Sequence, residues 1–347
     1  MKIRVAVDIM GGDNSPLELA SGAILAANEF ANDGLELILV GTEEAVNGLP
    51  PLPSNITTRV AEGFVEMTDD PACVMKEKKN STMVLACELC KQGEADAVVS
   101  AGNTGALFTA SSLIIRRIKG VRRAALGSVI PLEKPFVLLD CGANLDATPE
   151  VLSLYARMGS IYAENVLAIE KPRVALLNNG TESHKGTPLY SEAHALLKED
   201  ESINFIGNVE GKAVPFGACD VLVCDGFTGN ITLKLIEGMG KFMSKSLKEL
   251  FHASPVATLA GAMTLRHTKA LKKRLDPSEY GGAPFLGLLK PVVKAHGSSD
   301  AYSFRSAIKQ VMIYCAEGTV DKISESLQRK NDSIRRLRRA CLRRLYG

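Results

Sequence analysis

Five segments of the sequence combine glycine with polar side chains that could bind an anion. They are DIMGGDN (8–14), SAGNTG (100–105), DCGAN (140–144), NNGTESHKG (178–186) and CDGFTGN (224–230). Glycine allows a ligand to approach the backbone closely, and a helix that begins at such a turn offers free N–H groups and the positive end of its dipole. The segments therefore favour binding of phosphate or another oxyanion, although glycine turns also simply join strands to helices.

The segments follow short β-branched runs, and stretches with apolar residues at helical spacing lie between those runs. We expect strands at 3–8, 35–41, 95–100, 124–130, 136–140, 173–178, 204–206 and 220–225, and a last strand and turn within 292–300 after a turn-rich segment at 276–288. We expect helices at 17–29, 81–91, 105–118, 149–166, 189–198 and 229–251, and mostly helix at 301–345. This alternation predicts a mostly parallel sheet with helices on both faces, whose carboxyl ends gather the glycine segments.

The composition is that of an ordinary folded protein. Of 347 residues, 46% are hydrophobic and 23% charged, which excludes collagen-like, disordered and disulfide-scaffold classes. The eight cysteines show no paired spacing, and the first residues lead straight into a strand without a signal-peptide pattern, so we expect a cytoplasmic protein with reduced thiols. No apolar stretch approaches the roughly 18 residues of a membrane span.

The net charge of +2 is unevenly distributed. Residues 329–347 hold eight basic residues and one acid, a net of +7, whereas residues 1–328 have a net of −5. We expect a single elaborated α/β domain over 1–328 and a basic C-terminal helical arm over 329–347. The arm contains one aromatic residue, Tyr346, and no recognised nucleic-acid module, so a nucleic-acid partner is not expected.

The common catalytic motifs are absent from the sequence. It contains no P-loop, no G-x-G-x-x-G after the first strand, no H-E-x-x-H, no G-x-S-x-G and no zinc spacing. We therefore expect no cofactor and no metal, and covalent catalysis by Ser or Cys loses support. Asp8, Asp13, Asp140 and Asp225 all end strands and could share a metal, but capping of loops is the stronger expectation.

Several segments, taken together, resemble one family. DIMGGD, SAGNTGAL (100–107), LLDCGAN (138–144), ALLNNGTESHKG (175–186), CDGFTGN and YGGAPFLGL…KAHGSS (280–299) are similar to the signatures of the bacterial phosphate acyltransferases, the PlsX family, in order over residues 3 to 318. The resemblance implies transfer of a fatty acyl group from acyl carrier protein to inorganic phosphate, giving acyl phosphate for phospholipid synthesis. It also implies a three-layer α/β/α sandwich similar to the isocitrate and isopropylmalate dehydrogenases.

The same resemblance implies a homodimer, peripherally attached to the inner face of the cell membrane, whose product a glycerol-3-phosphate acyltransferase could use. Within this frame Pro255–Leu265 and the basic run 266–274 predict a membrane-surface element, in a helical insertion over about 252–278. Leu259, Met263 and Leu265 are expected to face the membrane; a dimer-interface helix pair is the alternative. Lys78 and Lys79 are candidates to contact the acidic carrier protein, unless they are simply solvated.

Phosphate is itself the nucleophile in such a reaction, so the enzyme must hold it and stabilise an oxyanion. We expect Lys185 to supply a positive charge, Asn230 a neutral donor, and His296 a proton for the departing thiolate or a phosphate ligand. The other expected phosphate- or substrate-binding residues are Asp8, Gly11, Gly12, Asp13, Ser100, Gly102, Asn103, Thr104, Gly105, Asn144, Gly180, Gly226 and Gly229. Asn103 and Asn230 could equally cap helices. A dehydrogenase on the related fold and a non-enzymatic membrane scaffold are the alternative functions.

Overall fold

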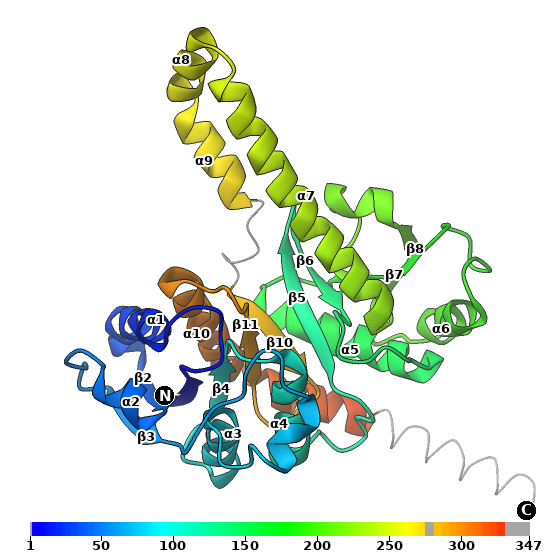
Figure 1. Cartoon of the computed structure of the whole chain (residues 1–347). Coiled ribbons are helices and arrows are strands. Elements are labelled where there is room, and N and C mark those ends of the chain that lie inside the picture. The colour runs from blue at the N-terminus through cyan, green and yellow to red at the C-terminus, as the bar shows by residue number, and fades with distance from the viewer. Residues whose placement is uncertain (1, 275–280, 330–347) are drawn as a thin grey trace, which may run out of the picture.

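The computed structural model describes residues 2–274 and 281–329, in which strands form one central 11-stranded sheet (Figure 1). The strands are β1 (Ile3–Asp8), β2 (Leu35–Gly41), β3 (Ile56–Val60), β4 (Ala97–Ser100), β5 (Ala125–Pro131), β6 (Pro135–Leu139), β7 (Arg173–Asn178), β8 (Asn204–Glu210), β9 (Val221–Val223), β10 (Gly282–Leu286) and β11 (Val292–Ala295). Their order across the sheet is β3-β2-β1-β4-β11-β10-β5-β6-β9-β7-β8. Most neighbouring pairs are parallel, as the alternating sequence pattern predicts.

Helices cover both faces of this sheet. They are α1 (Pro16–Glu29), α2 (Glu43–Asn47), α3 (Thr82–Gln92), α4 (Thr104–Ile114), α5 (Pro149–Val166), α6 (Pro188–Lys198), α7 (Gly226–His252), α8 (Pro255–Met263), α9 (Leu265–Arg274) and α10 (Ala301–Ala316), and residues 319–329 are also helical. Along β1, Val5 and Val7 belong to the core shared with α1 and α10, whereas Ala6 belongs to the core shared with α3 and α4. Because alternate residues of a strand point to opposite faces, this division confirms the three-layer sandwich.

The two halves of the sheet run in opposite directions. The strands β3, β2, β1, β4 and β11 are parallel to one another, and so are β6, β9, β7 and β8. Three antiparallel pairings, β11 with β10, β10 with β5 and β5 with β6, connect the two sets and reverse the direction. The glycine turns therefore leave the sheet as two groups, and the expectation that all of them share one edge is wrong.

Two strands lie where the sequence analysis expected none. The strand β3 occupies a segment without an expected element, and β10 occupies the segment expected to be turn-rich. The expected helix at 301–345 ends at Ala316, and helical structure resumes at 319–329. The remainder of the predicted basic arm, residues 330–347, lies outside the described residues.

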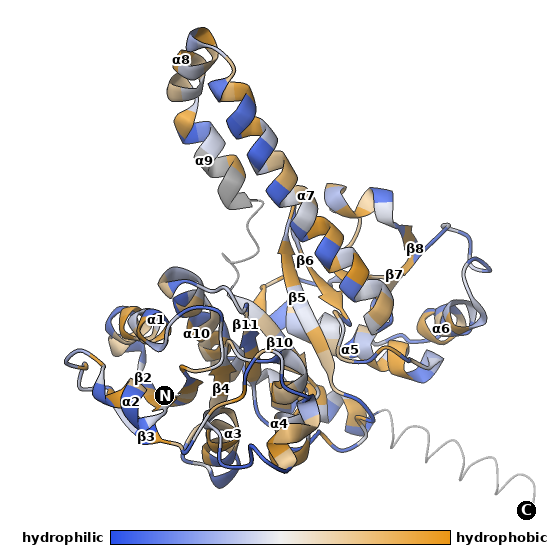
Figure 2. Ribbon diagram, viewed as in Figure 1, coloured by the Kyte–Doolittle hydropathy of each residue, from blue (hydrophilic) through white to orange (hydrophobic). Residues whose placement is uncertain are grey.

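The helices α7, α8 and α9 form a hairpin that projects from the body (Figure 1). Only Gly226 and Gly229 of the 27 residues of α7 are buried, so the projection begins well before the expected insertion at 252–278. Residues 275–278 of that expected insertion lie outside the described residues. Hydrophobic residues gather at the tip of the hairpin (Figure 2). In the described residues, no helix is both long enough and apolar enough to cross a membrane.

Candidate active site

The first group of turns lies at the carboxyl ends of β1, β4 and β11. Ser100 Oγ donates a hydrogen bond of 2.7 Å to Asp8 Oδ2, and the other oxygen of Asp8 accepts one of 3.1 Å from the Met10 N–H. The Gly102 N–H in turn donates to Ser100 Oγ at 3.1 Å. Burial raises the pKa of Asp8 to about 6. Asp8 and Ser100 thus fix the turns that follow their strands.

The glycines of this group are required because the turns pack tightly on one another. Gly11 has a φ of +76°, and a Cβ there would lie 2.6 Å from Val65 O. A Cβ on Gly12 would lie 3.2 Å from Gly297 O, the same carbonyl that accepts a 2.8 Å hydrogen bond from the Asp13 N–H. Side chains on Gly102 and Gly105 would come within 2.8 Å of Met83 and 2.6 Å of Pro71. These close contacts fix the conformation of the loops in the first group of turns.

Asn103 caps α4 and joins it to the loop before α3. Its Oδ1 accepts a 3.0 Å hydrogen bond from the Ala106 N–H, and its Nδ2 donates 3.0 Å bonds to Met67 O and Asp69 O. The amide therefore has no donor left for phosphate. Thr104, the first residue of α4, is partly exposed.

Lys294 lies beneath the same turns, and the sequence analysis did not single it out. It is paired with Ser100 in the register of β11 and β4, it is only 6% exposed, and its Nζ donates to Ala101 O at 3.0 Å and to Ala295 O. Burial lowers the pKa of Lys294 to about 8, against the opposing charges of Asp13 and Asp8. The available signal was a lysine inside the apolar strand VVKA.

His296 follows β11, and its imidazole ring is neutral with one N–H donor. Its Nδ1 accepts a 3.2 Å hydrogen bond from the Ser298 N–H, so the proton of the neutral ring is on Nε2. Partial burial lowers the pKa of His296; Glu237 opposes this, and the charges of Lys294 and of lysines on α7 add to it. The ring is therefore neutral at pH 7.

The second group of turns follows β6, β7 and β9. Asp140 organises its first turn, accepting hydrogen bonds from the Gly142, Ala143 and Asn144 N–H groups at 3.2, 3.0 and 2.9 Å. The Asn144 side chain donates to Ala124 O at 2.7 Å and to Asp140 Oδ2 at 2.8 Å. Asn144 is buried, and both of its amide protons are used within the protein. The Asn144 side chain therefore stabilises this loop.

The start of α7 packs directly on this turn. A Cβ on Gly226 would lie 2.4 Å from Asn144 O, and one on Gly229 would lie 1.8 Å from Asp140 O, so neither position can hold a larger residue. Asp225 caps the helix, accepting from the Thr228 N–H at 2.9 Å. Asp8, Asp140 and Asp225 thus each bond to their own loops, and in the described part of the chain no three His, Cys, Asp or Glu side chains gather as a metal site.

Lys185 and Asn230 present unused donors in the second group. The stem of Lys185 lies along Gly180, where a Cβ would come within 2.8 Å of it, and Asn230 lies against Gly142. Within the described residues, neither the Lys185 ammonium nor the Asn230 amide has a hydrogen-bond partner. Tyr190, which follows the Lys185 turn, donates a 2.6 Å hydrogen bond to Asp225 at the start of α7.

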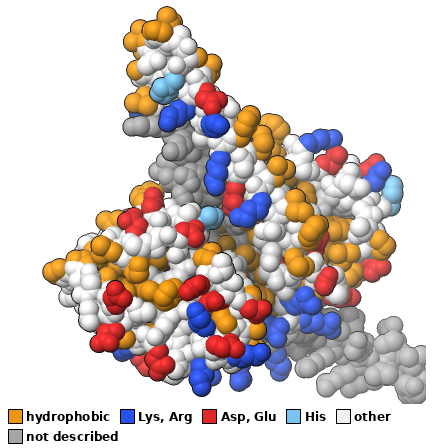
Figure 3. Space-filling view, in the orientation of Figure 1, with side chains coloured by type: hydrophobic (Ala, Val, Ile, Leu, Met, Phe, Trp, Pro, Cys, Tyr) orange, Lys and Arg blue, Asp and Glu red, His pale blue; other side chains and the backbone are white. Residues whose placement is uncertain are grey.

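One polar stripe of α7 brings the two groups together. Asn230, Lys234, Glu237 and Lys241 recur at helical spacing and share a face of the helix. Lys234 and Glu237 form a 3.0 Å ion pair, and the charges of this stripe act on His296. Lys and Arg side chains line this part of α7 in Figure 3. The helix therefore extends from the Asn230 turn to the turn that holds His296.

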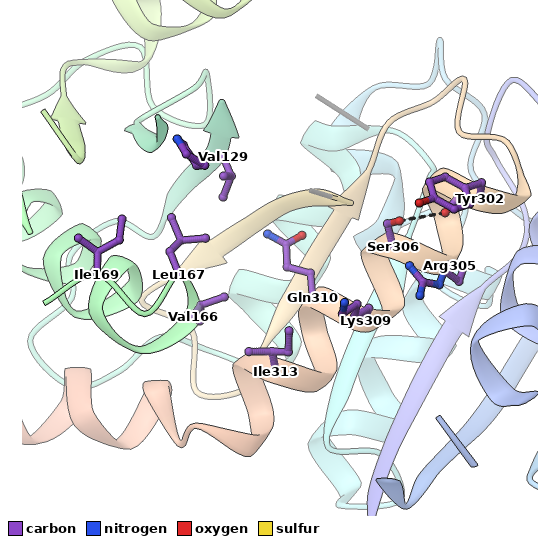
Figure 4. A pocket seen from close by; sticks show the side chains of 11 residues that line it. Val129, Val166, Leu167, Ile169, Tyr302, Arg305, Ser306, Lys309, Gln310 and Ile313 are labelled. Atoms are coloured by element: carbon purple, nitrogen blue, oxygen red, sulfur yellow. Dashed lines mark hydrogen bonds between the residues drawn. The ribbon is translucent and has the colours of Figure 1, made fainter. Parts of the chain in front are cut away.

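A groove of about 600 Å³ lies apart from these residues, between the end of α5, β5 and α10 (Figure 4). It combines apolar side chains such as Val129, Leu167 and Ile313 with Arg305 and Lys309 of α10. None of the expected site residues lines it. The turns, rather than this groove, hold the candidate site.

Comparisons with known proteins identify relatives of this chain. Phosphate acyltransferases from Caldanaerobacter subterraneus and Brevibacillus brevis are 41% and 44% identical to this chain, which they match over 96% and 94% of its length and 99% and 98% of theirs. The structure of a phosphotransacetylase from Streptococcus pyogenes superposes with a TM-score of 0.61 at 19% sequence identity. The match includes 91% of this chain and 94% of the phosphotransacetylase. The structure of a 4-hydroxythreonine-4-phosphate dehydrogenase from Klebsiella pneumoniae superposes with a TM-score of 0.54 at 12% sequence identity. The match includes 91% of this chain and 100% of the dehydrogenase.

The two structural similarities show the fold, and they confirm the expected relation to a dehydrogenase fold. The sequence relatives favour acyl transfer over the dehydrogenase and scaffold alternatives. A family model described as "Fatty acid synthesis protein" matches residues 3–321. The chain therefore belongs to this fatty acid synthesis family, as the glycine turns and their order along the sequence indicate.

Proposed function

We propose that this chain transfers a fatty acyl group from acyl carrier protein to inorganic phosphate, producing acyl phosphate and free carrier protein. The relatives named phosphate acyltransferase support the reaction. The observation that carries the assignment of the site is the pair of unused donors, Lys185 and Asn230. Asn230 lies at the start of α7, and the charges further along this helix act on His296. This set of donors suits a dianion and a thioester carbonyl, and it includes no side-chain nucleophile.

In the proposed mechanism, an oxygen of bound HPO₄²⁻ attacks the thioester carbonyl and forms a tetrahedral oxyanion. The Asn230 amide donates a hydrogen bond to that oxyanion, and the Lys185 ammonium balances the charge of phosphate. As the carbon–sulfur bond breaks, the proton of HPO₄²⁻ passes to the departing thiolate. The neutral His296 ring can relay it, because Nε2 gives its proton to sulfur and then receives the phosphate proton. The products are acyl phosphate and the carrier thiol, so atoms and charge balance.

The remaining expected residues act as supports in this proposal. The polar side-chain atoms of Asp8, Ser100, Asn103 and Asn144 form hydrogen bonds within and between the turns, so these residues support the site. Thr104 and the backbone N–H groups near the glycines are the groups that remain to contact phosphate. Lys294 supplies a second positive charge beneath the first group of turns.

The test uses the whole protein with palmitoyl carrier protein and labelled phosphate. Lys185→Ala and Asn230→Ala should each lower kcat more than tenfold, about 1.4 kcal/mol of barrier, with unchanged thermal unfolding. Lys198→Ala, which removes an exposed lysine at the end of α6, is the matched control and should retain full activity. Absence of acyl phosphate from the folded wild-type protein would refute the function; normal activity of Lys185→Ala would refute its role.

We also propose peripheral attachment to the inner face of the cell membrane through the tip of the hairpin. Val256 and Met263 on α8 are each 78% exposed, Leu259 is 64% exposed, and Leu265 at the start of α9 is 51% exposed. The basic run 266–274 follows, as in an element that binds anionic headgroups. Leu259→Glu with Met263→Glu should abolish co-sedimentation with anionic vesicles, whereas Leu113→Glu, on the body, should not.

A homodimer is part of the same proposal. The helix α7 exposes a row of large apolar side chains, which in a stable protein are normally covered: Phe227, Ile231, Leu235, Met239 and Phe242. Light scattering should give twice the chain mass, and Leu235→Glu should halve it. A membrane-bound glycerol-3-phosphate acyltransferase would then consume the acyl phosphate where it is released.

A further inference from the structure

A strongly basic loop joins α4 to β5. Its sequence, RRIKGVRR (116–123), contains five cations and no acid, although residues 1–328 as a whole have a net charge of −5. All five cationic residues are exposed: Arg116, Arg117, Lys119, Arg122 and Arg123. Figure 3 shows Lys and Arg side chains gathered at the lower edge of the molecule, below β5.

The basic loop has a fixed conformation. Its apolar residues Ile118 and Val121 are buried, at 2% and 6% exposure. The Ile118 N–H donates a 2.9 Å hydrogen bond to Gly287 O, and Arg116 O accepts one of 2.9 Å from the Leu289 N–H. The anchored backbone fixes the positions from which the exposed cationic side chains extend before any partner arrives.

Within the described residues no carboxylate forms an ion pair with these cations, although the charge of Arg122 contributes to the lowered pKa of Glu150. The Arg117 guanidinium donates to Arg122 O, and Arg123 Nη1 donates to Asp146 O at 3.1 Å, so the hydrogen bonds of this loop go to backbone carbonyls. Five like charges with no carboxylate in direct contact repel one another. An anionic partner would remove that repulsion, and the same field would speed its encounter with the enzyme.

The basic loop also borders the second group of turns. Arg123 bonds to Asp146, and the next residue, Ala124, accepts the side-chain hydrogen bond of Asn144. The 140–144 turn in turn contacts Asn230 through Gly142. A partner seated on the basic loop would therefore lie beside the turn that leads to the unused donors.

We propose that the basic loop is the docking surface for the acidic protein that delivers the acyl thioester. This inference rests on the proposed function, which requires such a carrier. A lipid surface fits less well, because the apolar residues of the loop are buried and offer nothing to insert into a bilayer. Free phosphate fits less well too, since the cations are spread along an exposed loop rather than gathered in a concavity.

Lys78, expected as a carrier contact, is already engaged. Its Nζ lies 2.9 Å from Asp69 Oδ2 and donates a 3.0 Å hydrogen bond to Phe64 O. Lys79 next to it is exposed, but the acidic Glu77 lies between it and the other exposed lysine of this segment, Lys76. Within the described residues the cations of the basic loop form no such ion pair, which makes the loop the stronger candidate.

The test reverses two cations whose side chains make no hydrogen bond in the described structure, Lys119→Glu with Arg122→Glu. Lys198→Glu with Lys212→Glu reverses two exposed lysines elsewhere and is the control. The loop variant should raise KM for palmitoyl carrier protein about tenfold or more, with kcat and KM for phosphate unchanged. Its activity on palmitoyl-pantetheine, which lacks the carrier protein, should equal that of the wild type. Added salt should raise the wild-type KM for the carrier more than that of the variant.

An unchanged KM for palmitoyl carrier protein in the loop variant would overturn the proposal. So would a variant that loses binding to anionic vesicles while it binds the carrier normally. A result that refutes the proposed function can be distinguished from one that refutes the docking surface. If the function were wrong, the wild type would make no acyl phosphate from either thioester. In that case, fluorescence anisotropy of labelled carrier protein still decides the matter: weaker binding to the loop variant supports docking, and equal binding refutes it.

Discussion

Replacing Lys294 by methionine tests whether a buried charge is kept for function at the expense of stability. Lys294 is almost completely buried, and its ammonium donates to backbone carbonyls beneath the first group of turns. Burial lowers the pKa of this lysine from 10.5 to about 8. The folded protein therefore loses this proton at a lower pH than the unfolded chain does.

The sign and size of the effect follow from that difference. Between pH 8 and 10.5 the unfolded chain binds a proton that the folded protein has released, so the free energy of unfolding rises with pH in this window. The whole difference corresponds to about 3 kcal/mol, of which about 2 kcal/mol is recovered between pH 7 and pH 9.5. Activity should change in the opposite direction, because the same deprotonation removes a positive charge from the site.

Urea unfolding and kcat/KM should be measured at pH 7 to 10 for the wild type, Lys294→Met and the exposed control Lys198→Met. Wild-type kcat/KM should fall above about pH 8 while the free energy of unfolding gains about 2 kcal/mol relative to Lys294→Met. The Lys294→Met variant should be weakly active, without that alkaline fall. Constant wild-type activity up to pH 10 would show that the charge is not used, and a constant stability difference would refute the burial argument.

Further predictions concern the start of α7. Tyr190→Phe removes the 2.6 Å hydrogen bond to Asp225 and should lower the free energy of unfolding in urea by about 1 kcal/mol; no change would mean that this bond is not stabilising. Gly229→Ala places a Cβ 1.8 Å from Asp140 O and should cost about 3 kcal/mol or more in thermal unfolding. Gly238→Ala, in the same helix but with no atom beyond the helix's own backbone within 4 Å of the added Cβ, should instead stabilise by up to about 1 kcal/mol, so equal melting of the two variants would contradict the placement of α7.

The sequence pattern predicted most elements of the sheet but not its reversal. Alternating strands and helices indicated parallel pairing, yet β5 and β6 are joined by residues 132–134 alone. Such a short connection can only make an antiparallel hairpin, because a parallel crossover needs a dozen or more residues. The spacing of the two expected strands contained this information. Applying it would have predicted two groups of turns.

The two missed strands have different physical causes. The strand β3 lies at the edge of the sheet and buries only Ile56, so it lacks the apolar run of a central strand. The strand β10 contains Gly282 and Pro284, residues that normally argue against a strand. It is central in the sheet, and its Phe285 and Leu286 are fully buried, so tertiary packing outweighs local propensity.

The site shows the same limit of local reasoning. Glycine turns and polar residues could be identified from the sequence; Lys185 and His296 lie on such turns, and Asn230 lies at the start of α7. The side chains of Asn103 and Asn144 looked equally available, but their hydrogen bonds go to neighbouring loops that only the folded chain brings near. Lys294 escaped notice because a lone lysine is normally on the surface.

The length of α7 determines how far the tip of the hairpin lies from the body and how the tip is rotated about the helix axis. The helix begins against the 140–144 turn and continues for 27 residues, which corresponds to about 40 Å at about 1.5 Å per residue. Deleting seven residues from its outer half would lower the tip by about 10 Å and change its facing little, since seven residues make nearly two turns. Deleting two would rotate α8 by about half a circle. Changes in the length of this helix therefore preserve the orientation of the tip only in steps of whole turns.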